Sequence, residues 1–245
     1  MAGLFFVSHG QTMGRPITQL VLFDIDGTLL ITRGMTSRCI EQSGKKFFGN
    51  SFVLGAVTPG HLDHQLFLRV AASNGFVLDP DVFEKWKNLY FHILAGELAS
   101  RPEDIFVLPG VRELWRRVHE LPGLAVGLLT GNFRKASYLK LDAAEIDRTH
   151  LDVQVHAEDG ESRVALVAAA KRILKNRNVC IASDRITIVG DTPRDIQCAQ
   201  AAGCRCLAVA TGRYSRGQLS NHVPDVLVDD LTDTAAIEAV LGLDR

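Results

Sequence analysis

The sequence of 245 residues lacks the features that would direct it to a membrane or to nucleic acid. No apolar run approaches the roughly 20 residues that span a bilayer. The apolar segment at residues 4–7 is too short for a signal peptide, and no cationic region precedes it. Basic residues form no block and the formal net charge is -1, which argues against a nucleic-acid surface or a polybasic membrane patch. We therefore expect no nucleic-acid and no membrane partner.

Cysteine is also scarce. The five cysteines are an odd number without a C-x-x-C pair, and Cys204 and Cys206 alternate along a predicted strand, as small buried thiols do. This pattern predicts a reducing, cytoplasmic location. The hydrophobic content of 47% suits one large globular domain or one domain that carries an insertion. The sequence leaves open whether the protein is a monomer or a homodimer.

The most informative stretch is residues 21–30, where an apolar strand stops at Asp24 and Asp26, followed by Gly27 and Thr28. Two carboxylates this close among apolar neighbours repel each other and lose hydration, so they need a cation or a proton. The alternative is a plain surface turn at a strand end. An EF-hand loop is excluded because its later oxygen ligands and closing Glu are missing.

Strands and helices alternate along most of the chain. Further strands are predicted at residues 124–129, 153–155, 186–189, 204–210 and 226–228, with helices at 111–118, around 139–141, at 162–175, 193–202 and 232–241. Thr192 as cap, Pro193 as first residue and Gly203 just past the end delimit one of these helices. The alternation predicts an α/β fold with a doubly wound parallel sheet and right-handed crossovers.

Between the first strand and the next lies far more chain than the roughly dozen residues of an ordinary crossover. It contains helical patterns at residues 35–48, interrupted by Gly44, at 61–74, and from Pro80 to Leu98. We therefore predict a helical domain at residues 34–107, inserted into an α/β domain made of residues 1–33 and 108–245. Residues 1–18 are expected to be an N-terminal arm. Its segment 7–12 faintly resembles the histidine-phosphatase signature, but Ser8 replaces the required Arg.

Three predicted strands end in polar residues: Asp24 and Asp26, Thr130 and Asn132, and Asp191 and Asp195. Ligands of open α/β sheets bind outside the carboxyl ends of the strands, so these side chains should meet at one edge. Converging carboxylates need a hard divalent ion, and Mg²⁺ suits them better than Zn²⁺, which would ask for His or Cys. Thr130 and the amides of Gly131 and Asn132, together with a cation, would then bind a phosphate.

These segments resemble the haloacid dehalogenase superfamily of phosphohydrolases. Its D-x-D-G-T motif is matched from Asp24 to Thr28, its strand-ending Thr by Thr130, and its G-D-x-x-x-D motif by Gly190, Asp191 and Asp195. The resemblance extends over the chain from about residue 19. It includes the helical insertion, which stands where the phosphoglycolate-phosphatase-like branch carries its cap.

The resemblance implies roles for these residues. Asp24 would attack phosphorus and form an aspartyl-phosphate, and Asp26 would act as general acid and then as general base. The backbone carbonyl of Asp26 and the carboxylates of Asp24 and Asp191 would bind Mg²⁺, while Asp195 would support the ion or its waters. Gly27, Gly131 and Asn132 are expected to contact the phosphate.

The cationic third motif is either Arg163 or Lys171, which are roughly 12 Å apart along one predicted helix and cannot both reach the phosphate. We predict Arg163, because it lies in the first turn, where the helix N-terminus also favours anions. In the insertion, His61 and Leu62 stand where relatives often show Arg and Thr. His61 is either a substrate contact or a helix-start histidine, and Asp63 is expected to cap that helix.

We therefore predict a Mg²⁺-dependent phosphatase for a small phosphorylated metabolite, such as phosphoglycolate or a sugar phosphate. A phosphoglucomutase-like phosphomutase is the alternative, since it shares the aspartyl-phosphate chemistry. A non-catalytic binding protein of the same fold is a further alternative. A 2-haloacid dehalogenase is disfavoured, because it needs no Mg²⁺ and usually lacks the second acid that Asp26 supplies.

Overall fold

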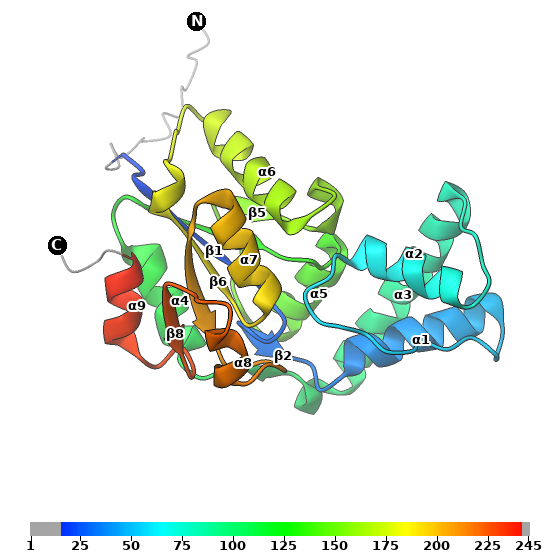
Figure 1. Cartoon of the computed structure of the whole chain (residues 1–245). Helices are drawn as coiled ribbons and strands as arrows, with labels where there is room; N and C mark the ends of the chain where they lie inside the picture. The colour runs from blue at the N-terminus through cyan, green and yellow to red at the C-terminus, as the bar shows by residue number, and fades with distance from the viewer. Residues whose placement is uncertain (1–15, 242–245) are drawn as a thin grey trace, which may run out of the picture.

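The fold is built on a parallel sheet of six strands in the order β5-β4-β1-β6-β7-β8, seen in a computed structural model that describes residues 16–241 (Figure 1). The strands are β1 (Gln19–Phe23), β4 (Leu124–Leu129), β5 (Val153–Val155), β6 (Ile186–Gly190), β7 (Arg205–Val209) and β8 (Val226–Val228). They lie within a residue or two of the predicted strands. The predicted α/β doubly wound fold is confirmed.

Strand β1 lies at the centre, where Phe23 pairs with Leu128 of β4 on one side and with Val189 of β6 on the other. From β1 the chain passes to β4 and β5, and then crosses back to β6 on the opposite side of β1. The strand order therefore reverses beside β1, and the crevice that such a reversal opens is where ligands of open α/β sheets bind.

Helices cover both faces of the sheet. They are α4 (Val111–Glu120), α5 (Arg134–Ala143), α6 (Arg163–Lys175), α7 (Pro193–Ala202), α8 (Arg216–Ser220) and α9 (Thr234–Leu241). Apolar residues of α6 and α7 pack with alternate side chains of β1, such as Leu22, and those of α4 and α9 pack with the others, such as Phe23. The ring of Phe23 lies 5.5 Å from that of Trp115 in α4. The strands are thus buried on both sides, as their continuous apolar runs require.

Helix boundaries follow the local signals. Thr192 and Asp195 form a capping box at the start of α7, Pro193 is its first residue, and Gly203 ends it in the left-handed region at φ 66°. The Ser162 hydroxyl accepts from the Ala165 amide and so caps α6. Short 3₁₀ turns occur at Pro102–Asp104, Ala157–Asp159 and Ser183–Arg185. The pattern did not predict α8 or these turns.

The insertion consists of α1 (Met35–Phe48), α2 (Asp63–Ser73) and α3 (Pro80–Ser100), which lie together to one side of the sheet (Figure 1). At its root, β2 (Leu30–Ile31) pairs antiparallel with β3 (Phe106–Val107), a pairing that the sequence did not predict. The helices are not isolated from the rest, because the ring of Phe67 in α2 lies 5.3 Å from that of Phe133 at the start of α5. The division into two domains at residues 34 and 107 stays a prediction.

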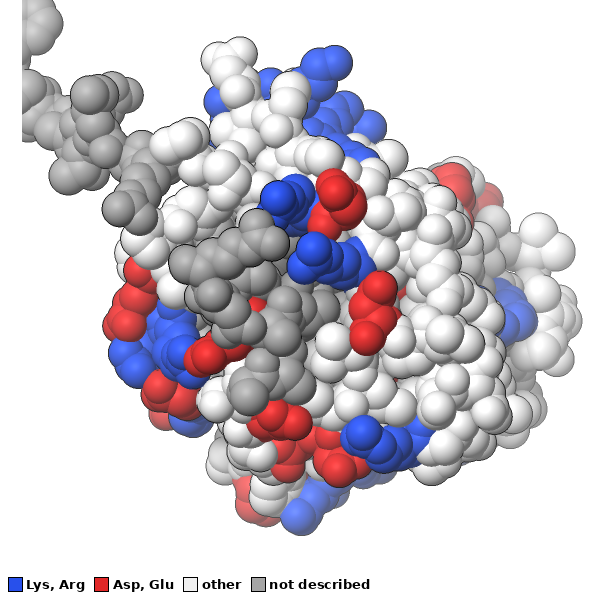
Figure 2. Space-filling view, turned by 60° about the vertical axis from the view of Figure 1, so that its left-hand side comes forward, with Lys and Arg blue, Asp and Glu red and all other residues white. Residues whose placement is uncertain are grey.

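The surface carries charges of both signs. On the face shown in Figure 2, acidic and basic side chains alternate over short distances and leave wide areas of other residues between them. Among residues 16–241, no helix combines the length and the apolar character that crossing a bilayer would require. The segment that resembles the histidine-phosphatase signature lies outside the described residues.

The sequence pattern indicated that Gly44 interrupts the first helix of the insertion, but the structure shows no interruption there. Helix α1 continues from Met35 to Phe48, and the ring of Phe52 packs directly over Gly44, where any Cβ would overlap it. Phe52 is only 1% exposed, so its ring has little room to move. Glycine is required here for close packing and not to end the helix.

Replacing Gly44 by Ala should lower the free energy of unfolding by about 1–3 kcal/mol, because overpacking outweighs the better helix propensity of alanine. Gly96 in α3 is the matched control, since a Cβ there meets nothing within 4 Å. Gly96→Ala should raise the free energy of unfolding by about 0.5–1 kcal/mol. Urea unfolding of both variants measures the two effects, and a stabilising Gly44→Ala would contradict this account of α1.

Candidate active site

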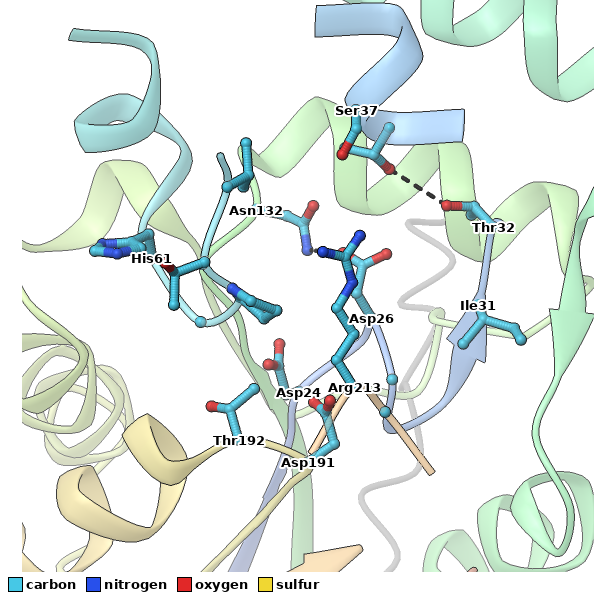
Figure 3. A pocket seen from close by; sticks show the side chains of 18 of the residues that line it. Asp24, Asp26, Ile31, Thr32, Ser37, His61, Asn132, Asp191, Thr192 and Arg213 are labelled. Carbon is cyan, nitrogen blue, oxygen red and sulfur yellow. Dashed lines mark hydrogen bonds between the residues drawn. The ribbon is translucent and has the colours of Figure 1, made fainter. Parts of the chain in front are cut away.

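Three buried acids meet where β1 and β6 end. Asp24 directly follows β1 and its amide donates to the Val189 carbonyl at 2.9 Å, Asp191 directly follows β6, and Asp195 lies in the first turn of α7. One carboxylate oxygen of each lies within 4.8 Å of the others. Figure 3 shows Asp24 and Asp191 close together at the bottom of the pocket. The convergence that the strand ends implied is present.

The Asp191 carboxylate fits between two glycines. A Cβ on Gly27, whose φ is +80°, or on Gly212 would overlap the Asp191 carboxylate. The positive φ and the contact both require glycine at position 27. Gly27 thus makes room for Asp191, and its expected contact with a phosphate stays a prediction.

Burial and repulsion between neighbouring carboxylates destabilise the charged forms of Asp191 and Asp195. Burial, with Asp195 and Asp24 adding to it, raises the pKa of Asp191 well above its ordinary value. Burial also raises the pKa of Asp195, against the opposing effect of Arg163. The three acids therefore form a site that a positive charge would stabilise.

Arg163 supplies positive charge from the first turn of α6. Its Nη2 donates to Asp24 Oδ2 at 2.7 Å and its Nη1 donates to Asp195 Oδ1. Burial alone would lower the pKa of Arg163, but Asp195 and Asp24 raise it further above its usual range. Lys171 instead donates to the Ser183 hydroxyl, away from the acids. Of the two cations weighed from the sequence, the fold brings Arg163 to the carboxylates.

A second group of polar residues surrounds Asp26. The side-chain Nδ2 of Asn132 donates to Asp26 Oδ2 at 2.7 Å and to the Thr130 hydroxyl at 2.9 Å. Lys140, which is fully buried in α5, donates to the same Asp26 oxygen and to Asn132 Oδ1, each at 2.6 Å.

Sequence reasoning missed Lys140. Its signal was a charged residue four positions from Ala136 and from Ala144, on a helix face whose other members are buried. A lysine on such a face needs a buried partner.

The loop before α2 closes over this part of the sheet. The Asp63 amide donates to the Gly131 carbonyl at 2.7 Å, and the Phe133 amide donates to the Asp63 carboxylate at 2.8 Å. A Cβ on Gly131 would overlap the His61 carbonyl, so these two segments of the backbone are in direct contact. The sequence predicted that Asp63 caps α2, and this prediction is wrong. Leu62 takes the cap position, and the Asp63 side chain faces Phe133 instead. Burial raises the pKa of Asp63 to about 7.

His61 lines the pocket, but its ring points away from the acids (Figure 3). Its Nε2 accepts from Arg69 at 3.1 Å and from Arg194 at 2.9 Å. Burial and these arginines lower the pKa of His61. Arg69 belongs to α2 and Arg194 to α7, so the imidazole links the inserted helices to the core. A contact between His61 and a substrate remains a prediction.

A cavity of about 390 Å³ is lined by Asp24, Asp26, Asp191, Arg163 and the loop before α2. Its floor holds Asp24, Asp26 and Asp191, and the inserted segment contributes mainly apolar and hydroxyl side chains. Those on the insertion side are Ile31, Thr32, Thr36, Ser37, Ile40, Val57, Thr58, Pro59 and Leu66. Arg213, from the segment after β7, extends into the pocket in Figure 3. A small anionic molecule would fit this combination of charge and size.

The carboxylates are suited to a divalent cation. Oxygen donors at this spacing match the ligands that hard ions prefer. Asp195 is the least available of the three, because Thr192 donates to its Oδ2 from both the amide and the hydroxyl, and Arg163 occupies Oδ1. Asp24 and Asp191 are therefore the better candidates for direct ligands.

Comparisons with known proteins find phosphatase relatives and solved structures of the same fold. A HAD-hydrolase-like family model matches residues 162–234. The pyrophosphatase PpaX of Bacillus cereus (strain B4264) is 26% identical over 222 residues, covering 89% of this chain and 94% of its own. A phosphoglycolate phosphatase of Pseudomonas savastanoi pv. phaseolicola is 23% identical over 237 residues, covering 90% of this chain and 80% of its own. CbbY from Rhodobacter sphaeroides, solved in complex with phosphate, superposes with a TM-score of 0.73 at 18% identity, covering 92% of this chain and 99% of its own.

The relatives indicate a hydrolase, and the structure places a group of buried carboxylates at the edge of its parallel sheet. The family-model match, the phosphatase relatives and the shared fold support a phosphatase of the haloacid dehalogenase superfamily.

Divalent-ion binding should be visible as thermal stabilisation. Saturating MgCl₂ at about 100 times its Kd should add about 2.7 kcal/mol of stability and raise Tm by several degrees relative to EDTA. In Asp191→Asn this increase should vanish, while Tm in EDTA should stay equal or rise, because the substitution removes a repelling buried charge. The exposed Asp184 provides a control, since Asp184→Asn should keep the full response. A wild-type Tm that does not respond to the ion would contradict the assignment.

Proposed function

We propose that this protein is a Mg²⁺-dependent phosphatase that hydrolyses a small phosphorylated metabolite through an aspartyl-phosphate on Asp24. The observation that carries the proposal is the position of Asp24, buried at the floor of a cavity, between Asp191 and the Arg163 guanidinium. A nucleophile, a site for a divalent ion and a fixed cation are what phosphoryl transfer requires.

Arg163 supports Asp24 as the nucleophile. The Arg163 guanidinium and the Ile25 amide, which donates to Asp24 Oδ1 at 2.8 Å, hold the carboxylate in one orientation. Arg163 is also placed to stabilise negative charge that develops on phosphoryl oxygens. A bound Mg²⁺, held by Asp24, Asp191 and the Asp26 carbonyl, with Asp195 supporting its surroundings, would neutralise charge on the phosphate.

Asp26 serves as the general acid and base. Its side chain is 41% exposed, whereas that of Asp24 is 6% exposed, so Asp26 has access to the leaving group and later to water. It donates a proton to the departing oxygen and then removes one from the water that hydrolyses the aspartyl-phosphate. Thr130 and the amides of Gly131 and Asn132 are the proposed phosphate contacts beside it.

The substrate is proposed to be phosphoglycolate or a sugar phosphate. A cavity of about 390 Å³ suits a small metabolite. Its hydroxyl-bearing side chains, such as Thr36 and Ser37, and the positive Arg213 would bind the polar, anionic remainder of such a molecule. The free cysteines among the described residues are consistent with a cytoplasmic location.

Asp24→Asn should lower kcat on p-nitrophenyl phosphate with Mg²⁺ by on the order of 10³-fold or more, since an amide cannot form the acyl phosphate. KM should change little by comparison. Asp184→Asn, which alters an exposed acid, should retain wild-type kinetics. Equal activity in wild type and Asp24→Asn would refute the assigned nucleophile, and equal inactivity of both on a panel of phosphorylated metabolites would favour a non-catalytic binding protein.

The phosphomutase alternative uses the same Asp24 chemistry and is separated by the fate of the phosphoryl group. With a sugar phosphate as substrate, a phosphatase releases inorganic phosphate in proportion to substrate consumed. A phosphomutase returns the group to a second hydroxyl and releases little phosphate. We expect stoichiometric release.

A further inference from the structure

Lys140 is a buried charge to which neither the sequence motifs nor the proposed chemistry gives a role. It is 0% exposed, and its ammonium donates to Asp26 Oδ2 and to Asn132 Oδ1 at 2.6 Å each. Removing an ammonium from water costs several kcal/mol unless close partners compensate. A lysine at this position therefore indicates that its two contacts serve a purpose beyond packing.

The two carboxylate oxygens of Asp26 have different surroundings. Oδ2 accepts from both Lys140 and the Asn132 amide, which donates at 2.7 Å. Oδ1 accepts no hydrogen bond from the part of the chain that the structure describes, and Asp26 lines the cavity. One oxygen is thus held by the protein and the other is left for a ligand.

Lys140 also fixes the orientation of Asn132. An ammonium can only donate, so the oxygen of the Asn132 amide must face Lys140. The amide nitrogen then faces Asp26 and the Thr130 hydroxyl, as Figure 3 shows for Asn132 and Asp26. Without Lys140, the amide would lose the contact that excludes the flipped arrangement, in which its oxygen would face the Asp26 carboxylate.

We propose that Lys140 is a positioning residue that holds Asp26 Oδ2, directly and through Asn132, so that Oδ1 delivers the proton to the leaving group. The inference rests on the proposed function. As Asp24 forms its bond to phosphorus, the bond to the leaving oxygen breaks, and this oxygen keeps the electron pair and takes the proton from Oδ1. Because Oδ2 receives two donors, the proton that Asp26 transfers belongs on Oδ1.

The test exploits the dependence of protonation on the leaving group. Phenyl phosphate has a strongly basic leaving oxygen that needs a proton, whereas 2,4-dinitrophenyl phosphate has a weakly basic one that departs without it. With Mg²⁺ present, Lys140→Met should lower kcat on phenyl phosphate by about 10²-fold or more, the contribution of a general acid. On the dinitrophenyl ester the loss should stay below about 10-fold, and KM should change little for either ester.

Two matched variants make the result specific. Lys135→Met removes an exposed lysine from the same helix and should leave kcat unchanged on both esters. Asp26→Asn should reproduce the selective loss, and the double variant Lys140→Met/Asp26→Asn should be no slower than Asp26→Asn alone, because both act on one step. Lys140→Gln keeps a hydrogen-bond donor. Its kcat on phenyl phosphate should therefore fall less than that of Lys140→Met.

An equal loss on both esters in Lys140→Met would show a merely structural role and overturn the proposal, as would no loss on either. If Asp26→Asn shows the selective loss and Lys140→Met does not, the inference about Lys140 fails while the proposed function stands. If wild type hydrolyses neither ester, or Asp24→Asn is as active as wild type, both fail together. Should Lys140→Met not fold, the same comparison in Lys140→Gln decides the question.

Discussion

The charge balance around Arg163 is the constraint on which the rest of the site depends. One guanidinium pairs with Asp24 and Asp195, while Asp191 lies within 4.8 Å of both acids without contacting it. Such a cluster can form only if the backbone places the three carboxylates close together. The parallel pairing of β1 with β6 does so, because residues that follow paired positions on parallel strands emerge at the same edge. Gly27 and Gly212 then leave the space that the Asp191 carboxylate occupies.

The inserted helices complete the site by bonding to the same edge of the sheet. Asp63 binds the Gly131 carbonyl and the Phe133 amide, and His61 accepts from arginines on both sides. The ring of Phe133 extends the apolar cluster of the insertion into the core. The loop that carries Thr130 and Asn132 is therefore held on one side by hydrogen bonds to the insertion and on the other by strand β4, which it follows. A cavity with a charged floor and a mainly uncharged roof follows from this arrangement.

Much of the fold was predictable because its signals are local. The apolar runs of β4 and β6, the Thr192–Pro193 start of α7 and the Gly203 end depend on the neighbours of each residue. The predictions that failed concern contacts between distant segments. Gly44 suggested a helix break from its propensity, whereas the ring of Phe52 requires it. Asp63 suggested a cap from its position, whereas a distant amide, that of Phe133, binds its carboxylate.

The sequence by itself determined most of the strands and helices along the chain, a resemblance to a known family, and the acids that end the strands, because hydrophobic periodicity, capping and motif spacing are properties of short segments. Only the tertiary structure decided which cations reach those acids. Arg163 and Lys171 share one helix, and Lys140 sits on another between two leucines; no local rule says which of these points to a carboxylate more than 100 positions away. That choice depends on how α5 and α6 pack against the sheet, since packing sets which side chains are buried and therefore which must be paired.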